Sequence, residues 1–126
     1  LENLSVQKCV ASNGPKNKIE LNLEVAGLNI YFRRSEIFSA YDIQVWKPAP
    51  DLYLNAARTM GVKPSECIVL EDSVNGLHAA SSASMLCLGN NNPLKPLPED
   101  IHGTEVYNDL HEIGNRLMSM GLMNSV

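Results

Sequence analysis

Two adjacent carboxylates, Glu71 and Asp72, follow directly on an apolar run that begins at Cys67. A short apolar run bounded by polar residues is typical of a fully buried strand, and the Ala-rich stretch from Val74 predicts a helix. The two acids therefore lie where a parallel strand ends, which is where open α/β sheets bind ligands. Carboxylate oxygens with no basic neighbour suit a small hard cation, so both acids are candidate ligands for Mg²⁺. The competing interpretation is that Asp72 or Ser73 only caps the helix.

A second strand is predicted to end at the hydroxyl of Ser12, followed by Asn13, Gly14 and Pro15. Pro15 is suited to the first turn of a helix that runs to about Ala26. Backbone N–H groups at such a helix start, together with the Ser12 hydroxyl, form a natural site for an anion. The alternative is an ordinary strand-to-helix turn in which Ser12 or Asn13 is the helix cap.

Lys47 follows a third predicted strand, over residues 38–43, and lies in a loop that Pro48 and Pro50 make rigid. A lysine fixed at the carboxyl edge of a sheet can serve as a point charge for a phosphate. The alternative is an ordinary solvated lysine in a polar loop.

The rest of the chain continues the alternation of strands and helices. Strands are expected over residues 8–12, 38–43, 67–71, 85–89 and 105–107, and helices over 15–26, 51–60, from about 75, and after a cap at Asp109. Successive βα units predict an α/β fold with a parallel sheet and right-handed crossovers. Parallel strands bring their carboxyl ends to one edge, so Ser12, Lys47 and the acidic pair are expected to meet there. Together they describe a phosphate held beside Mg²⁺.

Composition narrows the function classes. The chain has 126 residues, enough for one domain at most, and its 10 basic and 14 acidic residues give a net charge of −4. This balance argues against nucleic acid or an anionic membrane as partner. No run approaches the roughly 18 apolar residues of a membrane span, and no signal peptide is evident. The three cysteines, Cys9, Cys67 and Cys87, are odd in number and lie in predicted strands, which favours free thiols in the cytoplasm over a disulfide or a zinc site.

The chain resembles the C-terminal part of a haloacid-dehalogenase (HAD) superfamily phosphatase of the phosphoglucomutase-like subfamily. The segments that carry the resemblance are VASNGP at 10–15, KPAPD at 47–51 and VLEDSVNG at 69–76, and their order and separation match over about residues 8–90. The loops at 12–18 and 41–48 look closest to bacterial sugar-phosphate phosphatases of the 6-phosphogluconate phosphatase type. The resemblance implies a three-layer Rossmann-like parallel sheet, and Mg²⁺-dependent hydrolysis of a small sugar phosphate through an aspartyl-phosphate.

The resemblance also implies roles for individual residues. Ser12, with the backbone of Asn13 and Gly14, would bind the phosphoryl group, Lys47 would neutralise it, and Asp72 with Glu71 would hold Mg²⁺. Such clamps match phosphoryl transfer, which depends on positioning and charge stabilisation. Two residues depart from the family pattern: Ser84 replaces a glycine after the helix, and Trp46 stands where glycine often precedes the lysine.

The nucleophile of this family is the first Asp of an Asp-x-Asp-x-Thr motif, and these 126 residues contain no such motif. The family strand that carries it lies between the strands ending at Ser12 and Glu71, and a helical cap follows it. We therefore expect residues 1–126 to form the C-terminal part of a HAD-like core, incomplete at its N-terminal side, with sheet edges open to pairing with another chain. Leu1 in place of Met is consistent with a fragment, a processed product or an incomplete record.

Two functions of different classes follow. The first is a phosphatase whose nucleophilic Asp lies on an upstream segment, so that residues 1–126 alone are inactive. The second is a non-catalytic remnant or interaction domain that keeps the fold. A phosphosugar mutase is a third, minor possibility.

Overall fold

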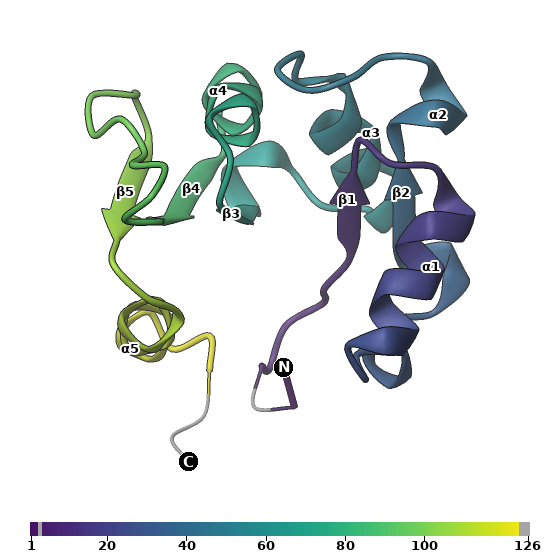
Figure 1. Cartoon of the computed structure of the whole chain (residues 1–126), viewed down its shortest axis with the longest axis horizontal. Helices are drawn as coiled ribbons and strands as arrows, with labels where there is room; N and C mark the ends of the chain where they lie inside the picture. The colour runs from purple at the N-terminus through teal and green to yellow at the C-terminus, as the bar shows by residue number, and fades with distance from the viewer. Residues whose placement is uncertain (3, 124–126) are drawn as a thin grey trace.

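The computed structural model describes residues 1–2 and 4–123, in which strands and helices alternate (Figure 1). In chain order the elements are β1 (Val10–Ser12), α1 (Lys16–Val25), η1 (Asn29–Tyr31), η2 (Arg34–Glu36), β2 (Ile37–Ser39), α2 (Ala40–Ile43), α3 (Asp51–Met60), η3 (Pro64–Glu66), β3 (Ile68–Glu71), α4 (Val74–Ser82), β4 (Leu86–Asn90), β5 (Thr104–Tyr107) and α5 (Leu110–Ser119). The predicted α/β class is confirmed. None of the helices in the described part combines the length and apolar character that crossing a bilayer requires.

The strands form two parallel sheets, with orders β1-β2 and β3-β4-β5. Ser12 is in register with Ser39, and Glu71 with Gly89, so the carboxyl ends of paired strands lie level. Within the described residues β1 pairs only with β2 and β3 only with β4. Figure 1 shows β1 and β3 at the inner edges of their sheets, toward the middle of the molecule.

Helices cover both faces of the larger sheet. Successive side chains of a strand point to opposite faces. Cys87 of β4 packs in a cluster with Leu77 of α4, whereas its neighbour Leu88 packs with Ile113 and Leu117 of α5. This helix–sheet–helix arrangement is the three-layer organisation that the family resemblance implies.

One hydrophobic cluster connects the two sheets. Tyr53 of α3, Val69 of β3 and Leu77 of α4 are buried in it, and Ala11 of β1 packs against it. Ala11 also packs against the cluster of Phe38 and the α3 side chains. The carboxyl ends of β1 and β3 are therefore held near each other by a shared core.

The predicted strand over residues 38–43 is wrong in its second half, because β2 ends at Ser39 and residues 40–43 form α2. The Ser39 hydroxyl accepts a hydrogen bond from the Tyr41 amide at 3.1 Å, which caps α2. Such a local bond offers the backbone an alternative to the strand ladder. Cys9 and Cys67 each lie one residue before a strand rather than inside it, and all three cysteines are free thiols.

Ser84 has a left-handed backbone with φ of 60°. It follows the C-cap Ala83 of α4, and the next amide, of Met85, donates to the Ala80 carbonyl at 3.0 Å, closing the helix end. A glycine adopts this conformation without the steric cost of a Cβ. The family departure at Ser84 thus falls where the backbone requires positive φ.

Candidate functional site

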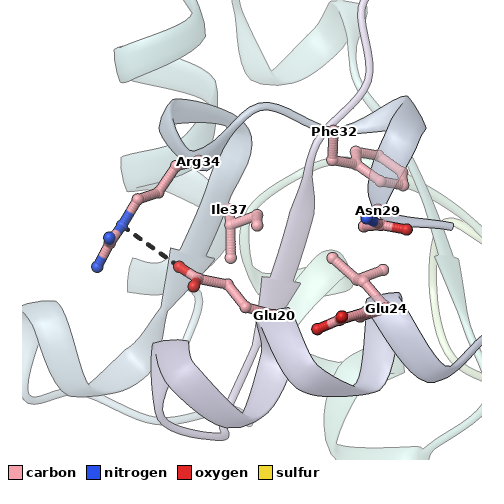
Figure 2. A pocket seen from close by; sticks show the side chains of 7 residues that line it. Glu20, Glu24, Asn29, Phe32, Arg34 and Ile37 are labelled. Carbon is pink, nitrogen blue, oxygen red and sulfur yellow. Dashed lines mark ion pairs between the residues drawn. The ribbon is translucent and has the colours of Figure 1, made fainter.

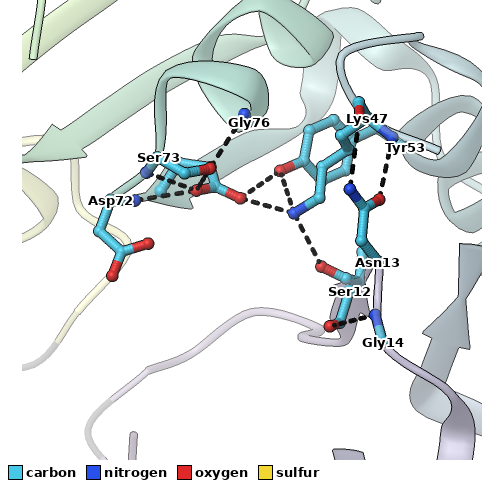
Figure 3. A network of polar contacts seen from close by, with 10 residues as sticks. Ser12, Asn13, Gly14, Lys47, Tyr53, Asp72, Ser73 and Gly76 are labelled. Carbon is cyan, nitrogen blue, oxygen red and sulfur yellow. Dashed lines mark hydrogen bonds and ion pairs between the residues drawn. The ribbon is translucent and has the colours of Figure 1, made fainter.

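The site is centred on an ion pair between Lys47 and Glu71. The Lys47 Nζ lies 2.7 Å from the Glu71 Oε1, and the two side chains are only 10% and 8% exposed. The same Nζ lies 3.4 Å from the carbonyl oxygen of Ala11. The ammonium therefore lies between the carboxyl end of β1 and that of β3, as Figure 3 shows. The structure thus brings Lys47 and Glu71 together at the predicted edge, with Ser12 next to Ala11.

The Glu71 carboxylate is surrounded by donors on both oxygens. Oε1 accepts from Lys47 Nζ and, at 2.9 Å, from the Tyr53 hydroxyl. Oε2 accepts from the amides of Asp72 and Ser73 and from the Ser73 hydroxyl, at 2.9 to 3.0 Å. Burial by itself raises the pKa of Glu71, but the bond and charge of Lys47 with the two Ser73 bonds outweigh it, so the pKa is lowered. Glu71 is thus a fully bonded carboxylate anion.

Gly76, in the first turn of α4, makes room for this carboxylate. A Cβ built on Gly76 would lie 1.9 Å from the Glu71 Cδ, closer than real Cβ contacts come. The helix start lies against the acid because the Ser73 hydroxyl caps α4, accepting from the Gly76 amide at 3.1 Å. The sequence left open whether Asp72 or Ser73 is the cap, and the structure assigns it to Ser73.

Asp72 turns away from the ion pair (Figure 3). Its side chain is exposed, and no hydrogen bond to its carboxylate is found among the described residues. Asp72 thus presents oxygens to solvent beside a saturated Glu71. The structure brings Asp72 to the same edge, where its backbone amide bonds to Glu71 but its carboxylate stays outside the hydrogen-bond network.

Asn13 fixes the loop that carries Lys47. Its side-chain oxygen accepts from the Lys47 amide at 2.9 Å, and its side-chain nitrogen donates to the Lys47 carbonyl at 3.3 Å. This side-chain role was not predicted, since the sequence assigned only the backbone of Asn13 to an anion. The Ser12 hydroxyl accepts from the Gly14 amide at 3.1 Å, and α1 has no side-chain cap, so neither Ser12 nor Asn13 is the helix cap.

Tyr53 belongs to the hydrogen-bond network around the Glu71 carboxylate and was not predicted from the sequence. It lies on α3, six residues after Lys47, and its hydroxyl donates to Glu71. Burial and the neighbouring Glu71 carboxylate raise the pKa of Tyr53, so the phenol stays protonated and acts as a donor. The available signal was a tyrosine within the apolar face of a helix, because a buried tyrosine hydroxyl usually needs a polar partner.

The two acids fit a magnesium site only as part of a larger set of ligands. Mg²⁺ usually keeps several waters and binds one or two carboxylates together with substrate phosphate oxygens. Asp72 has free carboxylate oxygens at the sheet edge, whereas the oxygens of Glu71 already accept five hydrogen bonds. Within residues 1–2 and 4–123 no group of three potential metal ligands is found. Asp72 is therefore the better placed of the two to ligate directly.

A separate cavity of about 250 Å³ lies between α1, η1 and β2 (Figure 2). Its lining includes an ion pair between Arg34 and Glu20, whose Nε and Oε1 atoms are 3.3 Å apart, and the side chains of Glu24 and Phe32. None of the predicted site residues lines this cavity. The residues predicted to form a site lie at the sheet edge instead.

Comparison with known proteins assigns the family. Residues 1–84, two thirds of the chain, match the model of haloacid dehalogenase-like hydrolases. The chain belongs to this family. A 6-phosphogluconate phosphatase of Escherichia coli is 40% identical over 85 residues, which are 68% of this HAD-like chain and 38% of that protein. A fructose-1-phosphate phosphatase of the same organism is 42% identical over 59 residues, or 47% of this chain and 30% of that protein.

A solved structure is similar over nearly the whole HAD-like chain. The HAD family hydrolase of Deinococcus radiodurans, with bound phosphate and sodium, has a TM-score of 0.82 and 30% identity, covering 94% of this chain and 54% of that one. The Rossmann-like fold and the family resemblance are thereby confirmed. The HAD-like chain spans less than half the length of these two curated relatives.

Proposed function

We propose that the protein containing this chain is a Mg²⁺-dependent phosphatase of small sugar phosphates. The observation that carries the proposal is the buried Lys47 ammonium, held by Glu71 and the Ala11 carbonyl at the carboxyl edge of two parallel sheets. A fixed cation at this edge suits a phosphoryl group. Relatives that are sugar phosphatases by name support the substrate class.

In this proposal each predicted residue has one task. The Ser12 hydroxyl, with the backbone at Asn13 and Gly14, binds the phosphoryl oxygens, and Lys47 neutralises their charge. Asp72 holds Mg²⁺, with the carboxylate of Glu71 beside it. When bound, the cation supplies positive charge against the phosphate oxygens.

We propose that the nucleophile is an aspartate on a strand outside residues 1–126, inserted between β1 and β3. Its carboxylate oxygen bonds to phosphorus as the P–O bond to the sugar breaks, and the sugar oxygen takes a proton from solvent, which the attacking water gives back in the second step. Water then cleaves the aspartyl-phosphate, releasing phosphate and restoring the carboxylate. The inner edges of β1 and β3, which pair with no other strand among the described residues, support this position. Without that aspartate residues 1–126 should be inactive.

The test is phosphate release by the full-length protein from a panel of sugar phosphates, 6-phosphogluconate and fructose 1-phosphate included, with Mg²⁺ and with EDTA. We expect Mg²⁺-dependent release by the full-length protein and none by residues 1–126. Isomerisation of a glucose phosphate without phosphate release would instead identify a mutase. Turnover by residues 1–126 alone would refute the external nucleophile.

A second candidate is a non-catalytic interaction domain, favoured by the same unpaired strand edges, which could pair with a strand of another chain. A stable complex of the full-length protein with no release of phosphate from any substrate would support it. For the compartment we propose the cytoplasm, on the basis of three free thiols. Burial raises the pKa of Cys87 to about 12 and of Cys9 to about 11, so both are unreactive thiols.

A further inference from the structure

One oxygen of Glu71 accepts hydrogen bonds from two other side chains at the centre of the site. Glu71 Oε1 accepts from Lys47 Nζ at 2.7 Å and from the Tyr53 hydroxyl at 2.9 Å (Figure 3). Lys47 Nζ also lies 3.4 Å from the Tyr53 hydroxyl oxygen, completing a triangle. Only Lys47 and Glu71 of these three were predicted from the sequence.

We propose that Tyr53 is a positioning residue, whose hydroxyl bonds to Glu71 and thereby keeps the Lys47 ammonium available to a phosphoryl group. This inference rests on the proposed function, since it concerns how the same site binds phosphate. Tyr53 acts through Glu71 and Lys47 and is not itself a ligand of the phosphate.

The donors of Lys47 support this role. An ammonium has three N–H groups, and here they have three acceptors: Glu71 at 2.7 Å, and Ala11 and Tyr53 both at 3.4 Å. The two long contacts are weak, so a phosphate oxygen can replace them at low cost. The short bond to Glu71 is the one that keeps the ammonium from moving toward a phosphate oxygen.

The Tyr53 hydroxyl limits how strongly Glu71 holds the lysine. The hydroxyl donates a hydrogen bond to Oε1, so it competes with the Lys47 ammonium for the lone pairs and the negative charge of that oxygen. Without it Oε1 would have Lys47 as its sole partner, and the ammonium would be drawn toward Glu71 and away from the phosphate. Removing the hydroxyl should therefore weaken phosphate binding.

The competing explanation is that Tyr53 only fills the core. Its ring is buried in the cluster of α3, β3 and α4, and Lys47 Nζ lies 5.3 Å from the ring centroid. Tyr53→Phe keeps the ring and removes one oxygen atom. Glu71 Oε1 still accepts from Lys47 in this variant, so no buried polar group is left unpaired and the variant should fold.

The chain contains a matched control. Tyr107 of β5 donates to Glu105 Oε1 at 2.6 Å, and Arg116 Nε donates to the same oxygen at 2.8 Å. This is also a tyrosine, a carboxylate and a cation sharing one oxygen, but none of the three is a predicted site residue. Tyr107→Phe therefore removes an equivalent hydroxyl without touching the site.

The experiment measures two binding constants by calorimetry on the full-length protein: that of inorganic phosphate with Mg²⁺ present, and that of Mg²⁺ alone. We expect Tyr53→Phe to weaken phosphate binding about tenfold, since a hydrogen bond to a charged group corresponds to roughly that factor. Mg²⁺ binding should stay within about twofold, because among the described residues no hydrogen bond joins Tyr53 to Asp72. Tyr107→Phe should change neither constant.

Each contrary outcome has its own meaning. Equal weakening of phosphate and Mg²⁺ binding would assign Tyr53 a merely structural role and overturn the inference, as would unchanged phosphate binding in Tyr53→Phe. Equal losses in Tyr53→Phe and Tyr107→Phe would overturn it too. If wild-type protein binds no phosphate and hydrolyses no sugar phosphate, the proposed function fails together with the inference. If wild-type protein does both, only the role of Tyr53 is at issue.

Discussion

Replacing Lys47 with methionine tests how the buried ion pair contributes to stability. The substitution keeps a long unbranched side chain but removes the cation 2.7 Å from Glu71, whose side chain is 8% exposed. Removing one partner of a buried ion pair typically costs about 3–5 kcal/mol, because the remaining charge is left uncompensated. Here the remaining carboxylate keeps its bonds to Tyr53, Asp72 and Ser73.

Protonation of Glu71 sets an upper limit on the part of the loss that comes from leaving its charge uncompensated. An ordinary glutamate has a pKa of about 4.3, so neutralising it at pH 7 costs about 3.7 kcal/mol, and at pH 5 about 1 kcal/mol. A variant that loses the cation can always take this route. We therefore expect Lys47→Met to lower the free energy of unfolding by about 3 kcal/mol at pH 7 and by no more than about 1 kcal/mol at pH 5.

The assay is urea unfolding of the full-length protein followed by far-UV circular dichroism at pH 5 and pH 7, which avoids the fluorescence of the adjacent Trp46. The double variant Lys47→Met/Glu71→Gln is the control, because it carries neither charge of the buried pair, and its stability relative to wild type should vary much less between the two pH values. A loss of unfolding free energy below about 0.5 kcal/mol at pH 7 would refute the reasoning, because the pair would then contribute no more than an exposed surface ion pair. A loss that is equal at both pH values would also refute the reasoning.

Three further outcomes are expected from the same unfolding assay. Gly76→Ala should destabilise the protein by about 2 kcal/mol, because the added Cβ would displace Glu71. The control is Gly114→Ala in α5, where the nearest atom to the Cβ is 3.9 Å away, and it should stabilise the protein by about 0.5–1 kcal/mol. Equal effects of the two substitutions would contradict this reasoning. Ser84→Gly should stabilise by about 0.5–1 kcal/mol by relieving the left-handed backbone, and a loss of stability would argue against that strain. Because its folded pKa is lowered, Glu71 contributes stability above pH 4.3 that is lost as pH falls further; Glu71→Gln should remove this part of the acid sensitivity, and an unchanged acid profile would exclude it.

The boundaries of elements were predictable where local signals dominate. The helix over 51–60 and the cap at Asp109, which accepts from the Glu112 amide at 2.8 Å, follow from residues next to each other in the chain. The end of β2 was mispredicted for a local reason as well. Ser39 uses its side chain to start a helical turn, and an apolar pattern alone does not reveal such a bond.

The sequence by itself determined which residues lie at the carboxyl ends of the strands or in the loops that follow them. Parallel strands share one edge, so Ser12, Lys47, Glu71 and Asp72 were expected at that edge. The structure places them there, because Ser12 and Glu71 end β1 and β3 and Lys47 Nζ lies 2.7 Å from Glu71 Oε1 and 3.4 Å from the Ala11 carbonyl oxygen. The contacts between them were decided only by the tertiary structure. Lys47 and Glu71 are 24 residues apart, and the distance between their charged groups depends on how α3 and α4 pack in the shared core.

The same packing gave Tyr53, Asn13 and Gly76 contacts that were not predicted from the sequence. The Tyr53 hydroxyl donates to Glu71, the Asn13 side chain accepts from the Lys47 backbone amide, and Gly76 leaves space for the Glu71 carboxylate because it has no side chain. A turn or a crossover of the chain brings each of these residues to its partner. The alternation of strands and helices along the chain follows from the periodicity of its apolar residues. Hydrogen-bond geometry between segments depends on distances of a few tenths of an ångström, which are set only when the helices pack on the sheets.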